Sequence, residues 1–103
     1  MYRQGDVLLI PAASRAGEEV PAVDGAHVLV RGVTDHAHTL RGAVKVYSDG
    51  DARYVVAVEP FRLVHEVDGR ETGEHATIEV PAGTYLVVVQ SQYDRGAVRD
   101  VED

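Results

Sequence analysis

The stretch AVKVYSDGDARYVVAVE, residues 43–59, decides the fold class of this chain. Two valine-rich runs, Ala43–Tyr47 and Arg53–Glu59, flank a polar turn that contains Asp49-Gly50. Valine is β-branched and favours pleated strands, and an Asp-Gly pair readily adopts the positive φ angles of a tight hairpin turn. The stretch therefore predicts a β-hairpin, and we interpret the rest of the chain outward from it.

Further strand signals recur on both sides of this hairpin at short spacing. Pro60 predicts a break, Pro81-Ala82-Gly83 predicts a turn, and Thr84–Gln90 is the most apolar run, expected at the centre of a sheet. Residues 11–25 show no clear period and predict a surface loop. The other expected strands are Asp6–Ile10, His27–Arg31, Val33–Leu40, Phe61–Val67 and His75–Val80, and Asp94 is expected to cap a short C-terminal helix over residues 94–103.

This organisation predicts one all-β domain that spans residues 1–103. The length of 103 residues fits a single domain, and the hydrophobic fraction of 45% is ordinary for a globular protein. Short strands separated by frequent turns are typical of a small barrel or sandwich, here of about eight strands.

Composition limits the classes of function. The net charge of -7 argues against broad binding to nucleic-acid phosphates, and the lack of cysteine excludes disulfides, thiolate metal sites and cysteine nucleophiles. The apolar run Val7–Ile10 stops at Pro11, too early for a signal peptide or a membrane span. We therefore expect a cytoplasmic protein with no membrane partner. An exposed strand edge could pair with a second copy of the chain.

The candidate functional residues are histidines. His36 and His38 lie two positions apart, so on a strand their side chains share one face. Two imidazoles side by side can bind one metal ion, or serve as a proton donor and acceptor, because imidazole titrates near neutrality. A His-x-His pair on a strand can equally be two exposed polar positions.

Two more histidines border the second expected hairpin. His65 lies near the end of one strand and His75 opens the next, so these two are expected close together across the ladder. If the sheet curls, all four histidines converge. Such a set would suit Zn, Mn, Fe or Ni, and an open coordination position would let the ion act on a small-molecule ligand by activating water or polarising a carbonyl.

Two other functions remain open. Without a metal, the same four histidines, helped by Tyr93 or Arg95, could cleave RNA as a ribonuclease. One imidazole would deprotonate a 2'-hydroxyl and another would protonate the leaving oxygen. The third interpretation is a non-catalytic accessory domain that binds a partner through a strand edge.

Part of the chain resembles the cupins, which are small metal-binding β-barrels. Gly32 and His36-Ala37-His38 resemble a shortened first cupin motif, and Pro81-Ala82-Gly83 resembles the turn of the second. The glutamate and the later histidine of the cupin pattern have no counterpart here. The resemblance therefore implies only His36 and His38 as metal ligands.

A more extensive resemblance is to a group of small uncharacterised bacterial proteins. It rests on Tyr2–Leu8, on the segment Thr34–His38, and on Pro81–Tyr93. That group has a close His-Glu-Glu-His, whereas nine residues separate His65 from His75 here. The resemblance names no activity, but it implies that the four histidines belong to one feature.

Overall fold

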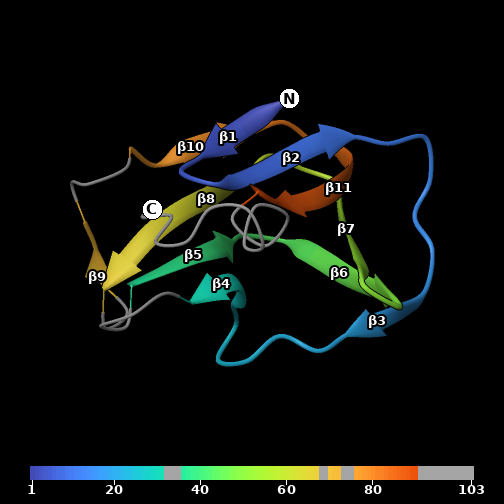
Figure 1. Ribbon diagram of the computed structural model, residues 1–103, viewed down its shortest axis with the longest axis horizontal. Coiled ribbons are helices and arrows are strands. Elements are labelled where there is room, and N and C mark those ends of the chain that lie inside the picture. The colour runs from blue at the N-terminus through green and yellow to red at the C-terminus, as the bar shows by residue number, and fades with distance from the viewer. Residues whose placement is uncertain (32–35, 68–69, 73–75, 91–103) are drawn as a thin grey trace.

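The chain folds into two antiparallel sheets, seen in a computed structural model that describes residues 1–31, 36–67, 70–72 and 76–90. The larger sheet has the strand order β1-β2-β11-β7-β6-β3, and the smaller has the order β10-β8-β5-β4 with β9 paired to β8 (Figure 1). The strands are β1 (Tyr2–Gln4), β2 (Val7–Pro11), β3 (Glu18–Val20), β4 (His27–Arg31), β5 (His36–Arg41), β6 (Val44–Asp49), β7 (Ala52–Ala57), β8 (Phe61–Val67), β9 (Arg70–Glu71), β10 (Ile78–Val80) and β11 (Gly83–Val89). The prediction of an all-β fold is confirmed.

The hairpin predicted over residues 43–59 is confirmed as β6 and β7. The two strands are in continuous antiparallel register from Val44↔Ala57 to Asp49↔Ala52. Gly50 occupies the turn with a φ of 62°, a conformation that glycine adopts without steric cost.

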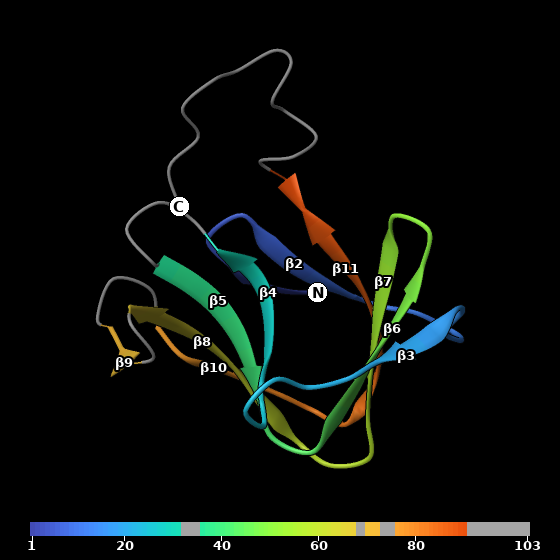
Figure 2. The ribbon, with the colours of Figure 1, turned by 90° about the horizontal axis from the view of Figure 1, so that it is seen from below.

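The two sheets are joined at one end of the molecule. Residues 42–43 lead from β5 to β6, residues 58–60 lead from β7 to β8, and residues 81–82 lead from β10 to β11, so the chain changes sheet three times there (Figure 2). Pro60 lies at the second change, as expected from its missing N–H donor. Among the described residues the two sheets do not close into a cylinder, so the fold is sandwich-like and the barrel alternative is not confirmed.

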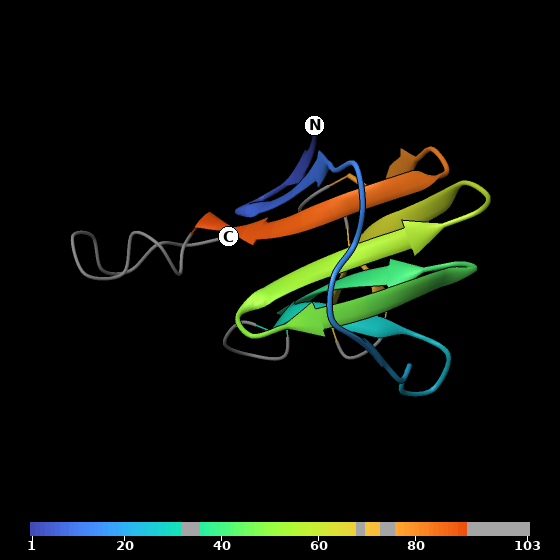
Figure 3. The ribbon, with the colours of Figure 1, turned by 90° about the vertical axis from the view of Figure 1, so that its right-hand side faces the viewer.

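The larger sheet contains two strands that the sequence did not predict. Both β1 and β3 are three residues long and lie at the edges of the sheet, and all three residues of β3 are exposed. The segment between β2 and β3 crosses the outer side of this sheet (Figure 3). On this crossing Arg15 stacks 4.0 Å from the ring of Tyr47. Gly17 lies so close to Ser48 that a Cβ would come within 2.0 Å of the Ser48 carbonyl oxygen.

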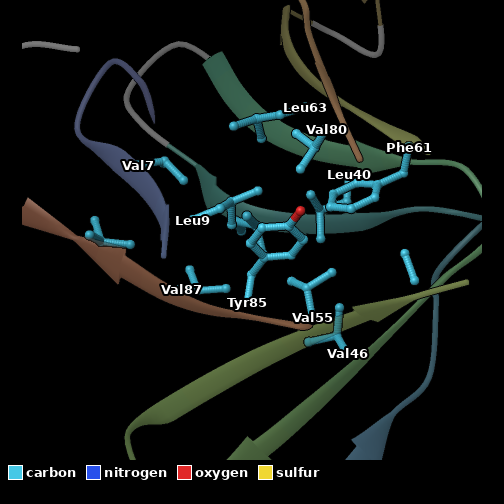
Figure 4. Close-up of a cluster of buried hydrophobic side chains, with 13 residues drawn as sticks. Val7, Leu9, Leu40, Val46, Val55, Phe61, Leu63, Val80, Tyr85 and Val87 are labelled. Carbon is cyan, nitrogen blue, oxygen red and sulfur yellow. The ribbon is translucent and has the colours of Figure 1, made fainter. Parts of the chain in front are cut away.

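The hydrophobic core lies between the sheets, and its residues come from β2, β4, β5, β6, β7, β8, β10 and β11. β11 pairs with both β2 and β7, which confirms its predicted central position. Its buried Tyr85 donates a hydrogen bond of 2.8 Å to the Pro81 carbonyl. Each fully buried large apolar side chain stabilises the fold by about 1.5–3 kcal/mol. The core cluster consists of Val7, Leu9, Leu29, Leu40, Val46, Val55, Ala57, Phe61, Leu63, Val80, Tyr85, Val87 and Val89 (Figure 4).

Some predictions lie outside the described residues, namely the C-terminal helix over residues 94–103 and the roles of Tyr93, Arg95 and His75. Within the described part of the chain, no helix is long and apolar enough to cross a membrane.

Candidate histidine site

Strand pairing brings two histidines from distant parts of the sequence directly opposite each other. β5 and β8 are neighbours in the smaller sheet, and their antiparallel register makes His38 the partner of His65. Alternation puts His36 and His38 on the same face as Leu40, and His65 on the same face as Leu63. Leu40 and Leu63 point into the core (Figure 4), so all three histidines lie on the inner face of the sheet.

The three imidazole rings form a row with His65 in contact with both others. The ring centroids of His38 and His65 are 4.9 Å apart, with 58° between the ring planes. The centroids of His36 and His65 are 5.3 Å apart, with an interplanar angle of 57°. The prediction that His36 and His38 share a face is confirmed, and His65 joins them from the neighbouring strand.

Burial differs along this row. His65 is 0% exposed and His38 is 2% exposed, whereas His36 is half-buried at the first position of β5. A buried imidazole such as that of His38 or His65 requires hydrogen-bond partners, because the transfer of its ring nitrogens out of water is otherwise unfavourable. The partners of the two buried rings come from other parts of the chain.

His38 is held by Gln4, the last residue of β1. The distance from His38 Nδ1 to Gln4 Oε1 is 2.7 Å. Gln4 Nε2 donates to the carbonyl oxygens of Leu63 at 3.0 Å and Ala76 at 2.9 Å. The Gln4 side chain is therefore a bridge between the two sheets and the histidine row. The sequence offered no period or spacing that would select Gln4.

His65 is held by Thr72, just after β9. The distance from His65 Nδ1 to Thr72 Oγ1 is 2.7 Å. The Thr72 N–H also donates to the His65 carbonyl oxygen at 2.9 Å, so the two residues are joined through side chain and backbone. Thr72 falls between the expected strands Phe61–Val67 and His75–Val80, and no pattern in the sequence selects it.

The position of His75 is not described, so its predicted place beside His65 stays a prediction. Strands β8 and β10 do pair as a hairpin, with Ile78 opposite Leu63. In the described residues the cross-strand partner of His65 is His38. No group of three or more His, Cys, Asp or Glu residues in that part of the chain has an arrangement suited to a metal ion.

The opposite face of β5 and β8 carries a charged pair. Arg41 donates from Nε to Glu66 Oε2 at 3.0 Å and from Nη2 to Glu66 Oε1 at 3.1 Å. The side chains of Arg41 and Glu66 are 32% and 10% exposed. The hydrogen bond to Glu66 raises the pKa of Arg41, so the guanidinium stays charged. This pair is directly behind the histidine row but does not share its face.

The fold and the site define an all-β sandwich protein with a histidine row on the inner face of its smaller sheet. Over residues 3–90 the chain matches the family described as "Domain of unknown function (DUF8820)", and it belongs to this family. The matched span contains Gln4, Thr72 and all four predicted site histidines. No curated protein and no solved structure matches the chain.

Proposed function

We propose that this protein binds a transition-metal ion through His38 and His65, with His36 as the nearest further ligand. The observation that carries the proposal is the spacing of the rings, 4.9 Å and 5.3 Å between centroids. Two imidazoles that bind one tetrahedral ion at metal–nitrogen distances of about 2 Å put their centroids about 5 Å apart. Ring packing alone also gives such distances, so metal titration is the decisive measurement.

The hydrogen bonds of the two buried rings support this proposal. Each Nδ1 is bonded to a side-chain oxygen, from Gln4 or from Thr72. Metal-binding histidines usually bond their second ring nitrogen in this way, which orients the ring. A metal ion can bind Nε2 of either ring without breaking these two bonds.

The described geometry requires one adjustment for a third protein ligand. The three histidines do not already form a set suited to an ion, so His36 would have to turn its half-buried ring toward His65. Water can occupy the remaining positions of a catalytic site. His75 remains the fourth ligand that the sequence predicts.

Burial favours a small ligand over a polynucleotide. Acid–base cleavage of RNA requires two imidazoles within hydrogen-bond reach of one phosphodiester. His65 is 0% exposed and His38 is 2% exposed, so a sugar-phosphate chain would have to displace part of the fold to reach both. A metal ion is a single atom, so it can lie between the two rings without displacing part of the fold.

The ligand atoms indicate which ions to test. Neutral imidazole nitrogen suits Zn²⁺ and Ni²⁺, whereas oxygen ligands are preferred by Mn²⁺ and Mg²⁺. A bound Zn²⁺ with an open position would lower the pKa of a coordinated water and so supply a nucleophile near neutral pH. We therefore expect the affinity order Ni²⁺ or Zn²⁺ above Mn²⁺.

The test is calorimetric titration of untagged, chelator-treated protein with ZnCl₂, NiCl₂ and MnCl₂. One equivalent of Zn²⁺ or Ni²⁺ per chain is expected, and His38→Ala and His65→Ala should each weaken binding by at least about tenfold. His27→Ala is the matched control, because His27 lies on the edge strand β4 and interacts with Glu19. Binding weaker than about 100 µM for every ion, or equal affinity in all three variants, would exclude the proposal.

A further inference from the structure

The side-chain amide of Gln4 can adopt only one orientation in its observed position. Its Nε2 lies 3.0 Å from the Leu63 carbonyl oxygen and 2.9 Å from the Ala76 carbonyl oxygen. Carbonyl oxygens only accept hydrogen bonds, so the amide NH₂ group must face both of them. Its oxygen, Oε1, must then face His38 Nδ1, at 2.7 Å. The hydrogen-bond network thus fixes the amide assignment, which is otherwise ambiguous.

The same logic fixes the proton on His38. The amide oxygen of Gln4 has no hydrogen to donate, so the close contact with Nδ1 requires a proton on Nδ1. In neutral imidazole one nitrogen carries the proton and the other carries the lone pair. Neutral His38 therefore has its lone pair on Nε2. The neutral histidine side chain in water prefers the Nε2–H tautomer, so the contact with Gln4 reverses the ordinary preference.

We propose that Gln4 is a positioning residue that locks neutral His38 in the Nδ1–H tautomer and so makes Nε2 its ligand atom. The tautomer lock is independent of any ligand, whereas its use rests on the proposed metal-binding function. Gln4 is 3% exposed, so water competes little for its amide. The lock also depends on β1, because Gln4 is its last residue.

His65 provides the internal comparison. Its Nδ1 faces a threonine hydroxyl, which can donate or accept a hydrogen bond. The contact with Thr72 therefore does not by itself determine the tautomer of His65. A change at Gln4 should alter the tautomer of His38 alone, and a change at Thr72 should leave His38 unaltered.

The test is a long-range ¹⁵N–¹H correlation spectrum of the metal-free protein, which distinguishes the two imidazole tautomers by their nitrogen shifts. The wild-type His38 should show the Nδ1–H pattern. Gln4→Met removes the acceptor and should shift His38 toward the Nε2–H tautomer. Thr72→Val should preserve the wild-type pattern at His38.

Gln4→Glu separates the tautomer effect from damage to the fold. Glutamate retains an acceptor for His38, but like methionine it has no donor for the carbonyls of Leu63 and Ala76, and it also places a charged carboxylate oxygen against them. It should lower stability more than Gln4→Met while keeping the Nδ1–H tautomer. If it does not fold, the wild-type and Gln4→Met spectra still decide the question.

The outcomes for the lock and for metal binding are distinguishable. An Nε2–H pattern for wild-type His38, or an unchanged Nδ1–H pattern in Gln4→Met, overturns the lock whatever the metal titration gives. A confirmed lock without Zn²⁺ or Ni²⁺ binding supports the positioning role and overturns only the proposed function. If both hold, Gln4→Met should weaken Zn²⁺ binding by about 10-fold to 100-fold, the usual effect of losing such a supporting bond.

Discussion

Strands β5 and β8 carry two polar pairs, a partly exposed one on the outer face of the smaller sheet and a buried one on the inner face, and these pairs are held in different ways. On the outer face Arg41 and Glu66 neutralise each other through two hydrogen bonds. On the inner face His38 and His65 contact each other through their rings, and each Nδ1 is bonded to a residue from another segment. The outer pair is stabilised by its own two members, whereas the position of the inner pair depends on Gln4 and Thr72. That dependence is expected of a site whose geometry serves a ligand.

The largest expected effect comes from removing one member of the outer pair. Arg41→Ala leaves the Glu66 carboxylate in its buried position without a cation. The free energy of unfolding should fall by about 2 kcal/mol, below the usual cost of breaking a buried pair because Arg41 is partly exposed. Urea denaturation measures the change. The control is Arg62→Ala, an exposed residue opposite Arg41, and equal losses in both variants would show that the ion pair contributes nothing.

The second prediction tests a partner of the inner pair. Thr72→Val removes the hydroxyl that bonds His65 and should lower stability by about 1 kcal/mol, since a buried polar atom loses its partner. Thr72→Ser retains the hydroxyl and should recover most of that loss. Thr84→Val, on β11, is the matched substitution away from the site. A loss no greater than that of Thr84→Val in urea denaturation contradicts the assigned role.

A smaller effect is expected when both members of the outer pair are replaced together. The double variant Arg41→Met with Glu66→Leu leaves no unpaired charge, so its stability should lie within about 1 kcal/mol of the wild type. Calorimetric titration of the same variant should give an unchanged Zn²⁺ affinity, because the pair does not share the face of the histidine row. Loss of metal affinity would show that the two faces are coupled.

The smallest expected effect concerns His27, a histidine outside the row. Burial lowers the pKa of His27, and the opposing influence of Glu19 is the weaker one. Because the folded-state pKa lies below the ordinary value of 6.5, the unfolded chain takes up the proton first as the pH falls. Its stabilising contribution is present above pH 6.5 and is lost as the pH falls through the folded-state value.

Replacing His27 by Gln removes this titration from the protein. His27→Gln should therefore lose less stability than the wild type between about pH 7.5 and pH 5. Urea midpoints measured across that range provide the comparison, and the other histidines are common to both proteins. Parallel stability curves for the two proteins would contradict the predicted pKa direction.

Much of the fold could be predicted because its signals are local. The Asp49-Gly50 turn and the strand Phe61–Val67 were both predicted as they occur. The short strands β1, β3 and β9 were missed, because three residues or fewer with polar side chains show no alternation of apolar positions. The sequence also did not distinguish a sandwich from a barrel, because strands show the same alternation of apolar and polar residues in both.

The candidate site was predictable only in part. Period-two alternation placed His36 and His38 on one face, and the structure confirms it. The hairpin pattern predicted His75 as a neighbour of His65, and that prediction lies outside the described residues; it did not indicate that β5 places His38 opposite His65 from the other side of β8. Gln4 is 34 residues from His38 in the sequence, and a lone polar residue at that separation gives no pattern to detect.

The sequence by itself determined the all-β class, the main hairpin and the shared face of two histidines, because turn chemistry and side-chain alternation act between near neighbours. The tertiary structure alone decided that β5 lies beside β8, that His38 meets His65, and that β1 brings Gln4 to the imidazole. These contacts join residues far apart in the chain. Which of the compatible strand pairings forms depends on the packing of the whole core, and no short stretch of sequence encodes that choice.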